Sequence, residues 1–323
     1  AMVAHLARRC DVLGADRGSA MTDAIEAFHT AIESAGLTPP DTIHCDGAIH
    51  RFSTNGRRGD DSGWYVLNLD GIPAGSFGCW RSGLHSTWCG KSDSSMTTAE
   101  RDAHRQRIKA MKAQREAEQA QRQQKASETA AALWQQADPA TAHPYLSTKA
   151  IQPHGIKTSG DTLLIPMRDT TGKLHSLQSI STDGSKMFHP GGRVKGCYFG
   201  IGKPADKLIV CEGFATGASI HEATGDAVAV AFNAGNLDAV ALALRTKYPA
   251  LQIVIAADDD HLTDGNPGLT KARSAALAVG GFVVAPQFPA GRPVKATDFN
   301  DLAAIAGLDA VRVCFAEIWE FVC

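Results

Sequence analysis

Apolar residues change their spacing several times along the chain, and each change predicts a different kind of element. Residues 22–36 place apolar side chains on one face of a helix, whereas residues 43–90 contain short β-prone runs separated by Gly, Asn and Pro turns. Residues 97–137 are rich in Glu, Gln, Arg, Lys and Ala, with few apolar positions. We therefore expect a helix, a small sheet and then a long charged helix.

The second half of the chain shows two further patterns. Residues 156–201 alternate like an antiparallel meander, and Asp183-Gly184 between two alternating runs is a strong hairpin signal. From residue 207 onward, four short apolar runs alternate with stretches of helical spacing at 214–224, 236–247 and 268–279. Strands that alternate with helices of this length predict βαβ units and a buried parallel sheet.

These patterns predict an α/β protein with a parallel sheet flanked by helices, preceded by an antiparallel meander and a small β-rich module. We expect five segments: a leader or added segment (1–20), an α+β N-terminal module (21–95), a charged helical linker (96–137), an antiparallel subdomain (138–206) and the parallel-sheet domain (207–323). The linker is interpreted as solvated, and the alternative is a basic arm that touches a nucleic-acid backbone.

Composition narrows the class of protein only moderately. The 323 residues carry a net charge of −2, which gives no global sign of nucleic-acid binding, although a local basic surface remains compatible with it. No apolar run reaches the length of a membrane span, so no membrane partner is expected. The eight cysteines form no CxxC pair, which suits reduced thiols in a cytoplasmic protein.

The N-terminal module contains residue types that bind zinc or nucleic acid, and each has a plainer interpretation. The candidate zinc ligands are His44, Cys45, His50, Cys79, His85 and Cys89. Because they lack paired-ligand spacing, we disfavour zinc and expect Cys79 and Cys89 to pack as small hydrophobes.

Three tryptophans of the same module could stack on the bases of a single-stranded template. Trp64, Trp80 and Trp88, with the nearby Arg81, are the candidate stacking residues. The alternative, which we favour for at least two of the three, is that they form the core of a small sheet.

Acidic residues follow two of the predicted parallel strands. KLIVC ends in Glu212-Gly213, and LQIVIAA ends in Asp258-Asp259-Asp260. In such sheets the functional crevice lies at the carboxyl ends of the strands, and a period of two points Asp258 and Asp260 the same way. Carboxylates gathered at one rim repel each other unless a cation neutralises them, and oxygen ligands suit Mg²⁺ or Mn²⁺.

The segment IVCEGFATGASI, followed by VIAADDD and GNPGLTKA, resembles the Toprim domain of primases encoded by plasmids, prophages and other mobile elements. HPYLSTKAI, SLQSISTDGSKMFHPGGRVKGCYFGIG and TDFNDL extend the resemblance over about residues 138–303, and DGIPAGSFGCWRSG resembles the N-terminal module of the same proteins. The resemblance implies that Glu212 acts as a general acid/base or organises the metal, and that Asp258 and Asp260 hold Mg²⁺. It also implies a further acidic metal-site position, which Asp298 matches less closely.

Two departures limit this transfer. The sequence lacks the zinc-ribbon spacing of bacterial replicative primases and contains no GxxxxGK[ST] helicase motif, so a helicase partner would act in trans. The basic residues that primases need are sought in the meander, at Lys186, Arg193 and Lys195, where they would bind template or nucleotide phosphate. Lys271, after the NPG turn, is a weaker candidate.

The leading hypothesis is a DNA primase that joins ribonucleoside triphosphates on a single-stranded DNA template during replication of a mobile element. One alternative is a Toprim-type nuclease, because the same carboxylates can direct water at a phosphodiester. The other is a non-catalytic replication protein that binds single-stranded nucleic acid. The primase-like meander favours the first hypothesis, and the intact Glu and Asp-x-Asp pattern argues against a decayed site.

Overall fold

The structure is a computed structural model that describes residues 21–57, 59–91 and 97–320; the predicted leader of residues 1–20 lies outside the described residues. The chain divides into two compact units, and the division falls between Gln114 and Arg115 inside the long helix α2 (Thr98–Gln136). Each unit is described by itself below.

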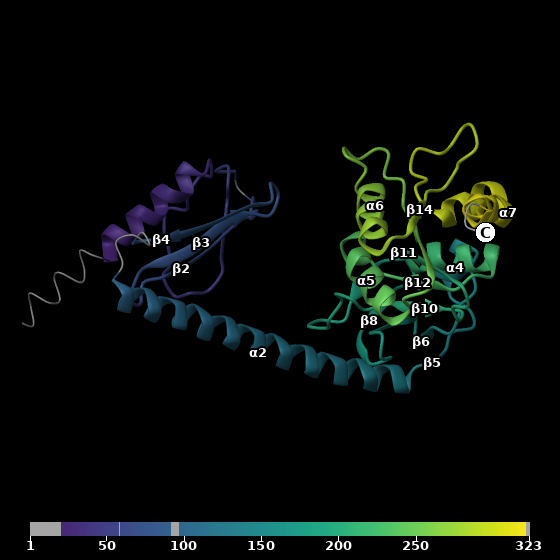
Figure 1. Cartoon of the computed structure of the whole chain (residues 1–323), viewed down its shortest axis with the longest axis horizontal. Helices are drawn as coiled ribbons and strands as arrows, with labels where there is room; N and C mark the ends of the chain where they lie inside the picture. The colour runs from purple at the N-terminus through teal and green to yellow at the C-terminus, as the bar shows by residue number, and fades with distance from the viewer. Residues whose placement is uncertain (1–20, 58, 92–96, 321–323) are drawn as a thin grey trace, which may run out of the picture. The chain divides into compact units, whose positions relative to one another are not determined.

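The first unit contains a helix packed on a four-stranded antiparallel sheet (Figure 1). The helix covers residues 21–34, close to the prediction. The strands pair in the order in which they occur in the sequence: β1 (His50–Phe52), β2 (Gly63–Asn68), β3 (Ala74–Cys79) and β4 (Leu84–Cys89). Phe28 of the helix lies so close to Gly75 of β3 that a Cβ at residue 75 would stand 2.6 Å from its ring. The glycine therefore allows the helix to approach the sheet.

The two faces of this sheet differ because side chains alternate along each strand. Tyr65, Leu67 and Phe77 point toward the helix and form its buried core with Phe28 and Ile32. The opposite face carries the alternate residues and has no helix packed on it within the described part of this unit. The sheet is thus half covered.

Helix α2 matches the predicted charged helix, but only its first part behaves as a solvated linker. Near its carboxyl end Ala126, Ser127 and Ala130 are buried. The Ser127 hydroxyl donates a hydrogen bond of 2.5 Å to the carbonyl of Leu174, and Ala130 packs against Leu177. The expectation of a solvated helix throughout is therefore wrong for its last turns, which belong to the core of the second unit.

A five-stranded antiparallel sheet opens the second unit. Its order follows the sequence: β5 (Asp138–Pro139), β6 (Lys157–Ser159), β7 (Thr162–Arg168), β8 (Leu174–Ile180) and β9 (Lys186–Phe188). The short helix α3 (Pro144–Lys149) lies between β5 and β6. The predicted hairpin turn connects β8 and β9, and Gly184 adopts the left-handed φ of 84° that this turn requires.

The last strand of the predicted meander lies elsewhere. β10 (Phe199–Ile201) pairs antiparallel with β12 (Val228–Val230) of the second sheet, and the bridge between Arg168 and Tyr198 joins this segment to the meander. The last run of the predicted 156–201 meander therefore belongs to the second sheet. Alternation along the sequence identifies a strand but does not identify its partner.

The second sheet has the order β10-β12-β11-β13-β14, with all strands except β10 parallel. Its remaining strands are β11 (Lys207–Cys211), β12 (Val228–Val230), β13 (Gln252–Ala256) and β14 (Phe282–Val284). Helices α4 (Phe214–Thr224) and α7 (Phe299–Glu320) cover one face, whereas α5 (Leu237–Lys247) and α6 (Pro267–Val279) cover the other (Figure 1). The 3₁₀ turn η2 (Ala234–Asn236) precedes α5.

Alternation in β11 shows why this sheet is buried on both faces. Ile209 and Cys211 contribute to the core beneath α4 and α7, while Leu208 and Val210 contribute to the core beneath α5 and α6. The first core also contains residues of the antiparallel sheet, such as Ile165, so the two sheets share one hydrophobic interior. The α/β fold with a helix-flanked parallel sheet is confirmed. No helix in the described ranges is both long enough and apolar enough to cross a membrane.

Candidate active site

Two parallel strands end side by side in acidic residues. Cys211 at the end of β11 is in register with Ala256 at the end of β13, so Glu212 and Asp258 follow neighbouring strands at the same rim. Because parallel strands run in one direction, their carboxyl ends meet at one edge of the sheet. Two acidic residues that are far apart in the sequence thus become neighbours.

Burial and mutual repulsion disfavour the ionised forms of these carboxyl groups. Burial, followed by the neighbouring charges of Asp298 and Glu212, raises the pKa of Asp258 to about 8. Burial and the charge of Asp260 likewise raise the pKa of Glu212. The Oδ1 atom of Asp258 is buried and has no hydrogen-bond partner. The site therefore carries more negative charge than its own residues neutralise.

Asp259, between the two candidate ligands, points away from this cluster. It accepts hydrogen bonds from Arg292 and from Asn266, the latter at 2.7 Å. Although its burial alone would raise the pKa of Asp259, these hydrogen bonds outweigh that effect and lower it. Neighbouring aspartates thus have opposite environments, as a strand-like period of two predicts.

The NPG turn after the acidic run fixes the carboxylate of Asp260. The backbone N–H of Gly268 donates to Asp260 Oδ2 at 2.9 Å, at the start of α6, while the side chain of Asn266 accepts from the Asp260 N–H. A Cβ at residue 268 would lie 2.5 Å from the carbonyl oxygen of Asp258 and 2.9 Å from Asp260 Oδ2. Only glycine therefore fits at this position without a shift of the acidic loop.

The late TDFNDL segment brings a fourth carboxylate to the rim. Asp298 accepts hydrogen bonds from the Thr216 hydroxyl at 3.1 Å and from the Asp301 N–H at 2.8 Å. Two residues later, Asn300 donates to the carbonyl of Lys149 at 2.8 Å and to the hydroxyl of Ser219 at 3.0 Å. These contacts hold α3 against the parallel-sheet domain.

Two lysines and a tyrosine stand beside the carboxylates. Lys186 on β9 senses the charges of Asp298, Glu212 and Asp258. Although the residue as a whole is exposed, desolvation of its ammonium group and the nearby Lys149 lower its pKa. Its Nζ lies 5.8 Å from the ring centre of Tyr145, whose buried hydroxyl has no hydrogen-bond partner. Burial, with the charge of Asp298, raises the pKa of Tyr145 to about 12.

Sequence reasoning selected Lys186 but missed Lys149 and Tyr145, although both lie in the HPYLSTKAI segment that carried part of the resemblance. The other predicted basic residues are placed differently. Arg193 lies 4.0 Å from Asp169, and Lys195 and Lys271 are exposed. None of these three is among the charges that act most strongly on Asp258 or Glu212.

The donor set fits a hard divalent cation, although the carboxylates do not converge on one point. Within the described ranges, no group of three His, Cys, Asp or Glu side chains is arranged to enclose a metal ion. Asp260 accepts a hydrogen bond from the Gly268 amide, and Asp298 accepts from the Thr216 hydroxyl and the Asp301 amide, so protein contacts already engage both carboxylates. Mg²⁺ retains several waters and needs only one or two protein carboxylates. The unpartnered Asp258 oxygen has the chemistry of such a ligand.

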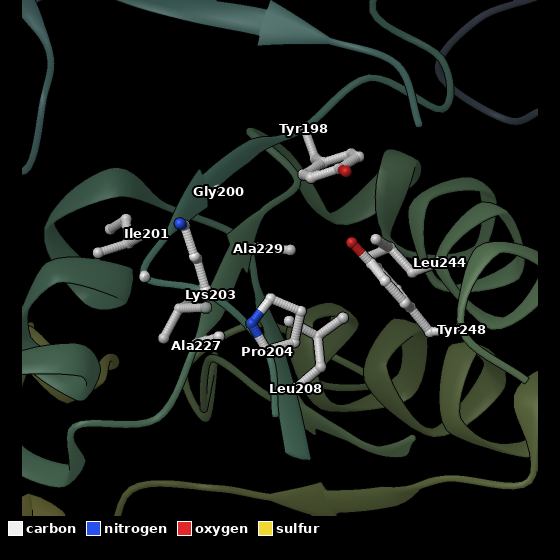
Figure 2. A pocket seen from close by; sticks show the side chains of 12 residues that line it. Tyr198, Gly200, Ile201, Lys203, Pro204, Leu208, Ala227, Ala229, Leu244 and Tyr248 are labelled. Atoms are coloured by element: carbon white, nitrogen blue, oxygen red, sulfur yellow. The ribbon is translucent and has the colours of Figure 1, made fainter. Parts of the chain in front are cut away.

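Two surface hollows lie away from this rim. One, of about 200 Å³, is lined by residues near the amino ends of β11 and β12, including Leu208 and Ala227. Figure 2 shows Lys203 on one side of it and the rings of Tyr198 and Tyr248 on the other. The carboxylates occupy the opposite ends of the strands, so this hollow is not part of the same site.

The N-terminal module requires two corrections. Trp88 packs on the covered face, where its ring centre lies 5.4 Å from that of Phe28, so it is not available for stacking. Trp80 is 64% exposed, and Trp64 is half-buried on the open face, so only one of the three tryptophans joins the core. The charge of Arg81 is paired with Asp60 at 2.8 Å.

Of the two cysteines expected to pack as small hydrophobes, Cys79 is buried as expected and Cys89 is not. Cys79 is buried at the end of β3, but the backbone N–H and the hydroxyl of Ser82 stabilise its thiolate and lower its pKa to about 6. Cys89 is exposed and therefore does not pack as a small hydrophobe.

Comparison with known proteins agrees with the geometry of the parallel-sheet domain. Residues 207–309 match the family model described as a Toprim domain, so the chain carries a Toprim domain. Toprim domains of primases generally depend on a divalent metal.

Two curated Escherichia coli proteins, each named DNA primase TraC, are similar over most of the chain. One is 40% identical over 286 residues, 82% of this chain and 27% of the relative. The other is 38% identical over 314 residues, 90% of this chain and 21% of the relative. The chain thus spans about a quarter of the length of these relatives. A solved DnaG primase catalytic domain bound to single-stranded DNA is 12% identical, with a TM-score of 0.44, over 61% of this chain and 80% of the other.

Proposed function

We propose that this chain is the catalytic portion of a DNA primase that makes short RNA primers on single-stranded DNA for the replication of a mobile element. The observation that carries the proposal is the cluster of Glu212, Asp258, Asp260 and Asp298 beside Lys186 at the carboxyl ends of the parallel strands. The two TraC relatives, which carry the name DNA primase, support the same conclusion.

The residues of the site have complementary roles in this proposal. Glu212, Asp258, Asp260 and Asp298 would hold Mg²⁺ or Mn²⁺, which neutralises charge on the triphosphate and on the departing pyrophosphate. Lys186 and Lys149 would bind phosphate oxygens, because their ammonium groups lie beside the carboxylates that would hold the metal ion. In the reaction, the 3′ oxygen of one nucleotide forms a bond to the α-phosphorus of the next, and the bond to pyrophosphate breaks. Glu212, whose pKa is raised, would take the hydroxyl proton.

The test is primer synthesis by the whole chain. The protein is incubated with single-stranded DNA, labelled ribonucleoside triphosphates and Mg²⁺ or Mn²⁺, and the products are resolved by size. We expect short, template-dependent RNA from the wild-type chain and none from Asp258→Asn or Asp260→Asn. Normal yield from either variant would contradict the assignment of the site. Degradation of the DNA without synthesis would instead identify a nuclease.

The partners in this proposal are a single-stranded DNA template, ribonucleoside triphosphates and a replicative helicase that acts in trans. Addition of a helicase to the same assay tests the last of these, because a functional partner increases primer yield on a long template.

A further inference from the structure

The uncovered face of the N-terminal sheet carries a row of aromatic and cationic side chains. Arg51 on β1 pairs with Trp64 on β2, Trp64 pairs with Gly78 on β3, and Gly78 pairs with His85 on β4. Residues that are directly opposite one another on neighbouring strands point to the same side of a sheet. Trp80, one residue beyond the end of β3, extends this row. We call the surface formed by Arg51, Trp64, Trp80 and His85 the aromatic face.

The rings on the aromatic face are close enough to act together. The ring centres of Trp64 and Trp80 lie 5.8 Å apart, and those of Trp64 and His85 lie 5.5 Å apart, with an interplanar angle of 37° in each pair. The guanidinium carbon of Arg51 lies 5.6 Å from the ring centre of Trp80. A cation over one end of an aromatic row is a favourable arrangement.

Gly78 keeps this surface open. A Cβ at residue 78 would stand 3.0 Å from atoms of the Trp64 ring and 2.2 Å from the carbonyl oxygen of Leu84. The indole of Trp64 therefore lies over the glycine, in space that a side chain at residue 78 would occupy. The absence of a side chain at residue 78 thus determines where the Trp64 ring lies on the sheet.

The charge of the aromatic face suits an anionic partner. The strand residues on this side of the sheet are Arg51, Trp64, Val66, Asn68, Ala74, Ser76, Gly78, His85, Thr87 and Cys89. None of them is a carboxylate. Aromatic rings beside a positive charge, on a face whose strand residues include no acid, match single-stranded nucleic acid, whose bases offer π surfaces and whose phosphates are negative.

We propose that the aromatic face binds the bases of single-stranded DNA by stacking on Trp64 and Trp80, with Arg51 on the phosphate backbone. This inference rests on the proposed function for the identity of the polymer, since a primase must hold an unpaired template. It assigns the template contact to the open face of the sheet and excludes Trp88, which packs against Phe28 on the other side.

The experiment measures binding of a labelled single-stranded oligonucleotide by fluorescence anisotropy, with the full chain and a range of salt concentrations. Trp80 is 64% exposed, so Trp80→Ala removes a stacking surface without opening the core. We expect it to weaken binding about tenfold, Trp80→Phe to restore much of the affinity, and the salt dependence to stay unchanged. Arg51→Gln is expected instead to lower the log–log salt slope by about 0.7. Phe282→Ala, which removes an exposed ring from β14, is the matched control and is expected to bind like the wild type.

Two results would overturn the proposal: unchanged affinity in both Trp80→Ala and a Trp64→Ala/Trp80→Ala double variant, or equal affinity of the wild-type chain for duplex and single strand. The outcomes also separate this proposal from the proposed function. Primer synthesis with no loss of binding in the tryptophan variants refutes the aromatic face alone. Normal stacking-dependent binding with no primer synthesis by the wild type refutes the proposed primase alone.

Discussion

Replacing Asp258 by asparagine is expected to stabilise the metal-free protein at alkaline pH. The folded-state pKa of Asp258 is about 8, whereas its ordinary value is 3.8. The native state therefore holds this proton more tightly than the unfolded chain does, so stability falls as pH rises from about 4 to about 8. The amide in the Asp258→Asn variant keeps the size of the side chain but carries no charge, and this loss of stability disappears.

The size of the effect follows from the pKa difference. At about 1.4 kcal/mol per pKa unit, a shift from 3.8 to about 8 sets an upper limit of several kcal/mol at pH 8. Because the site retains some access to solvent, we expect a gain of about 2–4 kcal/mol, which raises the melting temperature by about 5–15 °C. At pH 5 the gain shrinks to less than about a third, because most of the titration window lies above that pH.

The assay is thermal unfolding of both proteins at pH 5 and pH 8 with a chelator, repeated with excess Mg²⁺. Asp259→Asn is the matched control, because this neighbour is paired with Arg292 and its pKa is lowered. Its stabilising contribution is present above the unfolded pKa and is lost only at acidic pH, so its removal is expected to lower the melting temperature at pH 8. Added Mg²⁺ is expected to stabilise the wild type more than Asp258→Asn. An equal melting temperature of Asp258→Asn and wild type at pH 8, or an equal gain at both pH values, would refute the reasoning.

Three further predictions concern other parts of the chain. Lys186→Gln is expected to raise the KM for nucleotides at least about tenfold, while Arg193→Gln, beside Asp169, changes it little, as steady-state primer synthesis would show. Gly268→Ala is expected to cost about 1–3 kcal/mol in thermal unfolding and to abolish synthesis, because its Cβ meets the Asp258 carbonyl. Metal analysis is expected to find less than about a tenth of an equivalent of zinc, and stoichiometric zinc lost in Cys89→Ser would contradict this.

The position of the acidic rim could be predicted from the sequence because two rules suffice for it. Alternating strands and helices predict a parallel sheet, and parallel strands place Glu212 and Asp258 at one edge. The period of two then separates Asp258 from Asp259, and the structure shows these residues in opposite environments. Each of these steps depends only on local sequence and a general property of the fold.

The remainder of the site depends on contacts that local patterns do not contain. Lys149 reaches the rim because Asn300, 151 residues later, binds its carbonyl. Strand register decides which face Trp64 and Trp88 occupy, because it aligns Trp64 with Gly78 and Trp88 with Gly75 on β3. Residues an odd number of positions apart on one strand point to opposite faces, so the two tryptophans do the same. Neither register nor a long-range amide contact can be derived from a run of apolar residues.

In the acidic rim, a carboxyl group whose charged form is disfavoured stands directly beside two carboxylates that hydrogen bonds hold in place. Asp258 is buried with an unpartnered oxygen, and repulsion from its neighbours raises its pKa, so the metal-free site is disfavoured. Directly beside it, Asp259 is bound by Arg292 and Asn266, and Asp260 is bound by the Gly268 amide. These contacts fix the backbone that carries Asp258, so the loop cannot relieve the repulsion by moving away. A divalent cation would therefore bind most favourably where the fold leaves negative charge uncompensated, and the neighbouring residues keep that charge in place.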